Sequence, residues 1–186
     1  MTAPPSLPVA ILDLGYGNTE SIRLAFARLG VEAALTREVE TPDRLIIPGV
    51  GAAAYAMAQL REAGLVEPLR ARTRPTLGIC LGMQLLFDRT DEGDTPGLGL
   101  IPGDVRALAP QPAFPVPHMG WSRLHDVAPG IGLANGDYVY FAHGFACADT
   151  PATAALANYG RALIPAAIRK GPLWGAQFHP ERSSAP

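Results

Sequence analysis

Short apolar runs alternate with longer amphipathic stretches through the first half of the chain, and this pattern predicts strands that alternate with helices. Short apolar strands separated by helices are typical of a parallel sheet that is covered on both faces. The strands are expected over residues 9–14, 31–35, 45–47 and 76–79. The helices are expected over residues 20–29, 52–60 and 81–87.

The second half has a different pattern, which predicts a β-rich and partly antiparallel region. Residues 91–104 are rich in glycine and predict a loop, while prolines between residues 110 and 117 predict an extended connection. Gly171 and Pro172 predict a turn between the last two strands. The strands of this half are expected over residues 105–108, 138–143, 154–158, 166–169 and 173–178. The predicted fold class is α/β, with three layers, a mostly parallel central sheet flanked by helices, and a β-rich C-terminal half.

Length and composition indicate a single domain and no membrane or nucleic-acid partner. The chain has 186 residues, is 48% hydrophobic and carries a formal net charge of −2. It contains neither an apolar run of membrane-spanning length nor a basic patch. Residues 1–8 are rich in proline and lack the parts of a signal peptide, so we expect a flexible tail ahead of one domain over residues 9–186. The two cysteines lack a paired spacing, which favours the cytoplasm.

The most informative motif surrounds Cys80, which lies between a predicted strand and a predicted helix, with Gly78 and Gly82 two residues to either side. This is the cysteine form of a nucleophile elbow, in which a sharp turn presents the reactive side chain at the sheet edge. Glycines are needed there because a Cβ atom would crowd the turn. The free N–H groups of the following helix favour the thiolate. Cys80 is therefore predicted to be a nucleophile.

A base for this nucleophile is predicted near the end of the chain. His179 and Glu181 are two residues apart in a segment that we expect to be extended, so both side chains would point the same way. The imidazole would take the thiol proton, and the carboxylate would orient the ring. Pro180 lacks an N–H group, which predicts that this segment is the end of a strand.

Other motifs have simpler interpretations. Residues 49–54 follow a strand and partly match a dinucleotide-binding fingerprint, but a proline interrupts the motif and no ribose-binding acid follows at the usual distance. His118, His125 and His143 lack the spacing of metal ligands, so neither a metal nor a cofactor is predicted. Cys147 has no partner and is expected to be a loop or core thiol.

Together, the elbow and the His-x-Glu pair resemble the class I, or triad, glutamine amidotransferases. In that family the cysteine attacks the side-chain amide of glutamine, forms a glutamyl thioester and releases ammonia. Further motifs resemble one branch of the family, the glutaminase subunit of imidazole glycerol phosphate synthase in histidine biosynthesis. These motifs lie at residues 13–18, 48–51, 78–84, 97–103, 117–121 and 140–143. The resemblance extends over residues 9–181 and implies one type 1 glutamine amidotransferase domain.

The resemblance implies roles for the residues around the elbow. Cys80 would be the nucleophile, His179 the general base and then the acid, and Glu181 the residue that orients the imidazole. Backbone N–H groups of an oxyanion loop and of the residue after the nucleophile would stabilise the tetrahedral intermediate, and a peptide flip in that loop would switch the enzyme on. The residues expected to bind the substrate in these ways are Gly49, Val50, Gly51, Leu81, Gln84, Gly144 and Phe145.

The resemblance also implies a partner, because ammonia must reach a second active site without being protonated in water. In this family that site lies in a (β/α)8-barrel cyclase subunit, which joins ammonia to a phosphoribulosyl-formimino aminoimidazole carboxamide ribonucleotide. We therefore expect a heterodimer with the cyclase and L-glutamine as the substrate. The residues expected at the interface are His118, Met119, Trp121, Arg182 and Asn18. Trp121 suits a buried hot spot, although an ordinary core position is the alternative.

Three features depart from the family pattern. Arg182 lies where lysine is common, so a pair with a carboxylate of the partner would keep its charge and change its geometry. Gly144 lies where a serine or threonine is common, so a hydroxyl contact with the substrate is lost. Family members usually continue into one more helix, whereas this sequence stops at Pro186. We therefore expect an uncovered apolar surface near His179 and reduced stability.

Two other functions stay open at this point. The chain could be the glutaminase of another ammonia-channelling synthase, such as that of pyridoxal phosphate synthesis, although residues 117–121 favour the imidazole glycerol phosphate branch. It could also be a non-catalytic regulatory or scaffold subunit, although the intact Cys80, His179 and Glu181 favour an enzyme.

Overall fold

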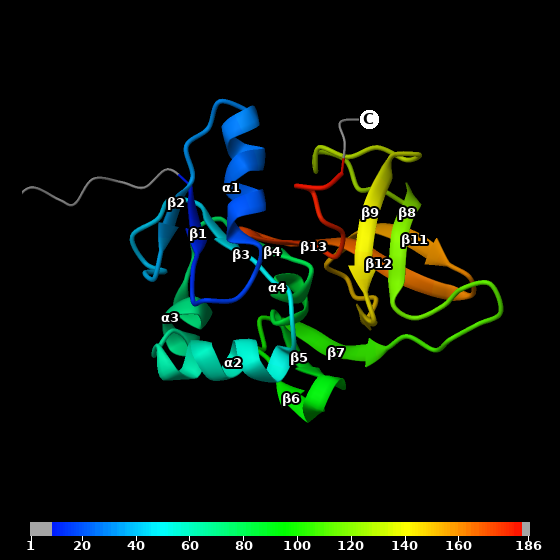
Figure 1. Ribbon diagram of the computed structural model, residues 1–186, viewed down its shortest axis with the longest axis horizontal. Helices are drawn as coiled ribbons and strands as arrows, with labels where there is room; N and C mark the ends of the chain where they lie inside the picture. Colours follow the sequence, from blue (N-terminus) through cyan, green and yellow to red (C-terminus); the bar gives the residue numbers. More distant parts are fainter. Residues whose placement is uncertain (1–8, 184–186) are drawn as a thin grey trace, which may run out of the picture.

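The computed structural model describes residues 9–183 and is built around a large mixed sheet (Figure 1). In the described residues this sheet has nine strands in the order β2-β1-β3-β4-β13-β12-β11-β8-β9. In that order, their bounds are Ala34–Thr36, Ala10–Leu12, Leu45–Ile47, Thr76–Ile79, Leu173–Ala176, Ala162–Lys170, Thr153–Tyr159, His118–His125 and Tyr138–His143. The strands from β2 to β13 are paired in parallel, and the pairs from β13 to β9 are antiparallel. Both the parallel core and the antiparallel second half were predicted.

Helices cover both faces of the parallel part, as predicted. In Figure 1, α1 (Thr19–Arg28) lies on one side of β1, β3 and β4, and α2 (Ala53–Glu62) and α3 (Val66–Ala71) lie on the other. Helix α1 begins where the Asn18 side chain accepts a hydrogen bond from the Ser21 N–H group, and it ends before Gly30, which has a φ of +72°. None of the helices between residues 9 and 183 has the length and apolarity of a membrane span.

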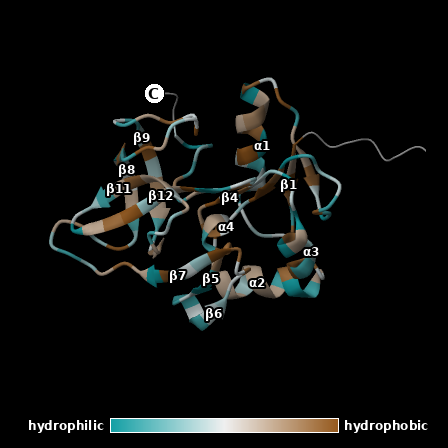
Figure 2. Cartoon of the chain, turned by 180° about the vertical axis from the view of Figure 1, so that it is seen from behind, coloured by the Kyte–Doolittle hydropathy of each residue, from teal (hydrophilic) through white to brown (hydrophobic). Residues whose placement is uncertain are grey.

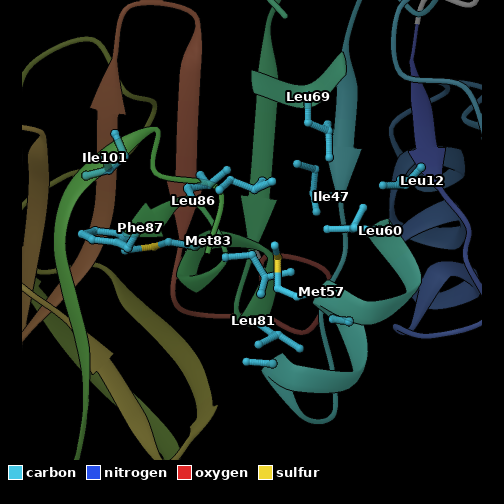
Figure 3. Packing of buried hydrophobic residues seen from close by; sticks show 14 of the residues in the cluster. Leu12, Ile47, Met57, Leu60, Leu69, Leu81, Met83, Leu86, Phe87 and Ile101 are labelled. Atoms are coloured by element: carbon cyan, nitrogen blue, oxygen red, sulfur yellow. The ribbon is translucent and has the colours of Figure 1, made fainter. Parts of the chain in front are cut away.

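A second, smaller sheet lies beside α2. Its order is β10 (Phe145–Cys147), β7 (Ile101–Ala107), β5 (Phe87–Thr90) and β6 (Thr95–Pro96), and the short 3-10 helix η1 (Glu92–Asp94) connects β5 to β6. The largest cluster of buried side chains lies between the two sheets and α2, where Met57, Leu60, Met83 and Phe87 are almost fully buried (Figure 3). In Figure 2, much of β1 and β12 has the colour of hydrophobic residues, as expected for strands that are buried on both faces of the sheet.

The predicted helix over residues 81–87 is wrong in its extent. Helix α4 (Leu81–Gln84) has only four residues, and Phe87 begins β5. The reason is a set of long-range hydrogen bonds: the Leu85 carbonyl accepts from Leu98, and the Leu86 carbonyl accepts from Leu100 and Ile101. These carbonyls therefore belong to the junction with the second sheet. For the same reason, the loop predicted over residues 91–104 contains η1, β6 and the start of β7.

An apolar cavity of about 230 Å³ lies beside β13, close to the end of the described chain. Leu77, Trp174, Phe178 and Pro180 are among its lining residues. Residues 180–183 next to it form turns and a bend. This is the part of the sheet surface near His179 where uncovered apolar residues were expected.

Candidate active site

Cys80 occupies a sharp turn between β4 and α4. Its φ of +52° and ψ of −110° are rarely adopted by residues with a side chain, so the turn is strained, as a nucleophile elbow requires. A Cβ atom on Gly78 would lie 2.5 Å from the Gly82 carbonyl oxygen, and one on Gly82 would overlap the Ile47 carbonyl oxygen. The two flanking glycines are therefore required by close packing of the backbone, which confirms the reason given from the sequence.

Strand pairing brings the end of the chain to the elbow. Strand β13 pairs with β4 in parallel, with Ala176 opposite Ile79, and the Cys80 N–H group donates to the Ala176 carbonyl at 2.7 Å. The segment after β13 must then pass beside Cys80. The His179 N–H group donates to the Tyr140 carbonyl at 2.8 Å, which fixes this segment against β9. The predicted nucleophile and the predicted base, 99 positions apart in the sequence, thus meet at the carboxyl ends of neighbouring strands.

His179 and Glu181 form the predicted pair. Nδ1 of His179 lies 2.8 Å from Oε1 of Glu181, and the side chains are only 7% and 2% exposed. Burial alone would lower the pKa of the imidazole, but its interactions with Cys80 and Glu181 outweigh burial and raise the pKa to about 10. His179 is therefore protonated at neutral pH, and its imidazolium places a positive charge beside the Cys80 sulfur.

A cavity of about 260 Å³ opens above Cys80. Its lining includes the three residues of the predicted triad and every residue predicted to bind the substrate, together with Asn18 and Arg182 from the predicted interface. Three further residues line it that were not among the predicted site residues, namely Glu92, Ala142 and His143. The Glu92 carboxylate accepts a hydrogen bond of 2.8 Å from the Ala53 N–H group and so caps α2, whose own cap residue, Ala52, has no side-chain acceptor. No local motif marks Glu92, because its partner is 39 positions away.

The predicted oxyanion loop lies next to the elbow. A Cβ atom on Gly49 would come within 2.5 Å of the Leu81 Cβ atom, so the loop backbone can approach the elbow only because residue 49 is glycine. Gly51 has a φ of +102°, which also favours glycine. Leu81 is the first residue of α4, so its N–H group has no acceptor within the helix and is free to bind an oxyanion. Because α4 has four residues, its dipole is weaker than the predicted longer helix would supply.

Gln84 lies at the floor of the cavity and is 5% exposed. Its Nε2 group donates 3.0 Å hydrogen bonds to the Phe145 carbonyl and to Oε1 of Gln177. Its two N–H groups are therefore used inside the protein, and only its Oε1 atom is available to a ligand. A Cβ atom at Gly144 would meet only Val116, at 3.7 Å. A residue with a side chain would therefore fit at this position.

The prediction of the residues at the partner interface is partly wrong. Met119 and Trp121 project from β8 and are 64% and 48% exposed, which suits an interface and argues against a core position for Trp121. His118 is only 1% exposed and stacks on Tyr159, because neighbouring residues of a strand point to opposite faces. It therefore lies beneath the surface that Met119 and Trp121 form.

Asn18 and Arg182 line the cavity, and Arg182 also contacts Tyr140, whose ring packs edge to face against Trp121. The Asn18 side chain caps α1, and the Arg182 guanidinium lies 5.4 Å from the centre of the Tyr140 ring. Within residues 9–183, no group of three or more His, Cys, Asp or Glu side chains is arranged to bind a metal ion.

Comparison with known proteins places this geometry in a family. The family model described as "Glutamine amidotransferase class-I" matches residues 10–186. The chain belongs to the class I glutamine amidotransferase family. This glutamine amidotransferase is 48% identical over 182 residues to the imidazole glycerol phosphate synthase subunit HisH of Xanthomonas axonopodis pv. citri, and equally to that of Xylella fastidiosa Temecula1; each alignment covers 95% of this chain and 90% of the relative.

Solved structures share the fold of this glutamine amidotransferase at low sequence identity. A crystal structure of a glutamine amidotransferase has a TM-score of 0.73 and 22% identity, and covers 93% of this chain and 90% of that one. A glutamine amidotransferase of Thermotoga maritima has a TM-score of 0.60 and 19% identity, and covers 93% of this chain and 76% of that one. The arrangement of the central sheet is therefore common to these proteins.

Proposed function

We propose that this chain is the HisH-type glutaminase subunit of imidazole glycerol phosphate synthase in histidine biosynthesis. The main observation behind the proposal is that Cys80, His179 and Glu181 lie together beside one cavity. The proposed oxyanion loop lines the same cavity. The 48% identity to curated HisH subunits over nearly the whole chain supports this branch over another ammonia-channelling synthase. The intact triad argues against a non-catalytic subunit.

Acylation begins when the Cys80 thiolate attacks the side-chain carbonyl carbon of glutamine. The carbonyl oxygen becomes an oxyanion, which the N–H group of Leu81 and those of the Gly49–Gly51 loop would stabilise. The His179 imidazolium then donates its proton to the leaving nitrogen, so that the C–N bond breaks and ammonia leaves a glutamyl thioester.

In deacylation the same groups act again, but His179 now accepts a proton and does not donate one. Neutral His179 takes a proton from a water molecule, which attacks the thioester carbonyl, and glutamate leaves as the thiolate re-forms. The Glu181 carboxylate, 2.8 Å from Nδ1, keeps the imidazole in one orientation through both steps and stabilises its charged form.

The ammonia would pass to a cyclase subunit with a (β/α)8 barrel, in a heterodimer in the cytoplasm. Met119 and Trp121 project from β8 beside the site and are the proposed anchors of that interface. Arg182 would pair with a carboxylate of the cyclase, and Asn18 would lie at the rim.

Purified complexes with the cyclase test this proposal. Glutamine hydrolysis should be abolished by Cys80→Ala, while the same complex should still make imidazole glycerol phosphate from added ammonium salts. Loss of both activities would indicate that the substitution disrupts the complex. Recovery of the chain with a different synthase partner, and not with the cyclase, would overturn the proposed pathway.

A further inference from the structure

Gln177 is a buried polar residue that the mechanism above does not use. It lies directly after β13, two positions before His179, and is 0% exposed. Its Nε2 atom lies 3.7 Å from the Cys80 sulfur, within hydrogen-bonding distance for sulfur. Gln177 does not line the cavity, so it approaches the nucleophile from beneath and has no contact with the space that the substrate would occupy.

The direction of this hydrogen bond follows from one group that can only accept. The Phe145 carbonyl lies 3.0 Å from Gln84, so the end of the Gln84 amide that faces it must be the NH2 group. The same NH2 group lies 3.0 Å from the Gln177 amide, which must therefore present its oxygen to Gln84. The NH2 group of Gln177 is then left to face the sulfur as a donor.

The same carbonyl is held from its other side by a buried pair of imidazoles. Nδ1 of His143 lies 2.7 Å from the Phe145 carbonyl and must carry its proton, so Nε2 of His143 accepts from Nδ1 of His118 at 3.2 Å. Nε2 of His118 in turn accepts from the Ser122 hydroxyl at 3.0 Å. Burial lowers the pKa of both imidazoles to about 4, so both are neutral at pH 7, as this chain of donors requires.

We propose that Gln177 is a further catalytic residue, an N–H donor that stabilises negative charge on the Cys80 sulfur, with Gln84 and the Phe145 carbonyl as the groups that set its donor direction. The inference rests on the proposed function, because it assigns a role in the same thiolate chemistry. A donor is favourable there because Cys80 is only 6% exposed, so the protein must replace part of the hydration that a charged sulfur has in water. The Ala142 carbonyl oxygen, 3.9 Å from the sulfur, opposes the charge and makes a compensating donor more important.

The test compares Gln177→Met with the wild-type chain, both in complex with the cyclase. Methionine keeps an unbranched side chain of similar length and removes the donor. The rate at which iodoacetamide alkylates Cys80 at pH 7, without glutamine, should fall roughly tenfold, as expected for loss of a hydrogen bond to a charged group. The kcat for glutamine should fall by about the same factor, and any change in KM should be smaller than the fall in kcat, because Gln177 reaches the substrate only through Gln84.

A second variant keeps the proposal testable if Gln177→Met does not fold. Gln177→Glu has the same shape, still accepts from Gln84, and places an oxygen next to the sulfur, so it should slow alkylation at least as much. Circular dichroism and thermal unfolding show which variants fold. Wild-type alkylation in either folded variant, or a rise in KM with an unchanged kcat, would overturn the proposal. Alkylation also separates this inference from the proposed function, since it needs neither glutamine nor turnover.

Discussion

Replacing Glu181 by glutamine tests how far the buried carboxylate controls His179. Glutamine has the same shape and still offers an oxygen to Nδ1 of His179, but it carries no charge. The contact is short, 2.8 Å between Nδ1 and Oε1, and both side chains are less than a tenth exposed. Water can therefore replace little of the lost interaction.

The expected loss of activity can be estimated from the distance between the charges of Glu181 and His179. Two unit charges about 4 Å apart interact by about 4 kcal/mol at the effective dielectric constant typical of proteins, and about 1.4 kcal/mol corresponds to a factor of ten. The pKa of His179 is raised to about 10 by its interactions with Cys80 and with the charged Glu181. We therefore expect Glu181→Gln to lower kcat/KM by a factor of about 10²–10³.

The pH dependence should change in a defined direction. In the wild-type enzyme the imidazolium that protonates the leaving nitrogen is lost only as pH rises through about 10. In Glu181→Gln the pKa of His179 falls toward its ordinary value of 6.5, so the alkaline limb of kcat/KM moves to lower pH.

The assay is ammonia release from glutamine by the complex with the cyclase, measured between pH 6 and 10. Glu67→Gln is the matched control, because it makes the same chemical change at a side chain that is 78% exposed, and it should leave the profile unchanged. An alkaline limb of Glu181→Gln that coincides with the wild type, together with a loss of less than tenfold, would refute the reasoning.

Three further substitutions have defined expectations. Gly82→Ala should destabilise the chain by about 2–3 kcal/mol in urea unfolding, since its Cβ atom would overlap the Ile47 carbonyl; an unchanged midpoint would contradict the close packing. Trp121→Ala should weaken cyclase binding by at least about 2 kcal/mol in calorimetry and leave the Tm of the chain nearly unchanged, because the side chain is half exposed; equal affinity would exclude it as an anchor. Glu92→Ala should lower the free energy of unfolding by about 1 kcal/mol in thermal unfolding, because the cap of α2 is lost; an unchanged Tm would show that Glu92 does not stabilise α2.

The triad could be predicted from the sequence because its signals are local. The elbow depends on the glycines around Cys80. The pairing of His179 with Glu181 was predicted, but its reason was wrong, because β13 ends at Ala176 and the segment is a turn in which the Arg182 and Ser183 N–H groups donate to the His179 carbonyl. The parallel direction of the first strands also follows from local pattern, since helices separate most of them. The elbow, the His179–Glu181 pair and the parallel pairing were predicted and are present in the structure, whereas the extended geometry of the pair's segment is not.

The errors arose where distant segments decide the local structure. Helix α4 is short because residues 98–101 donate to the Leu85 and Leu86 carbonyls, and no pattern within residues 81–87 indicates those partners. Glu92 reaches the cavity by capping a helix that is distant in the sequence. The burial of His118 was accessible in principle, because a strand over residues 118–121 would place it on the face opposite to Met119 and Trp121.

The most direct test of the central claim is covalent labelling of Cys80 by an electrophilic glutamine analogue, such as a chloroketone. In the complex with the cyclase and its bound ligand, peptide mass spectrometry should find one label per chain, on Cys80, and glutaminase activity should disappear in proportion to labelling. Excess glutamine should protect Cys80, and Cys80→Ala should take up no label. Continued turnover by a fully labelled complex, or a complex that releases ammonia while Cys80 stays unlabelled, would contradict the account.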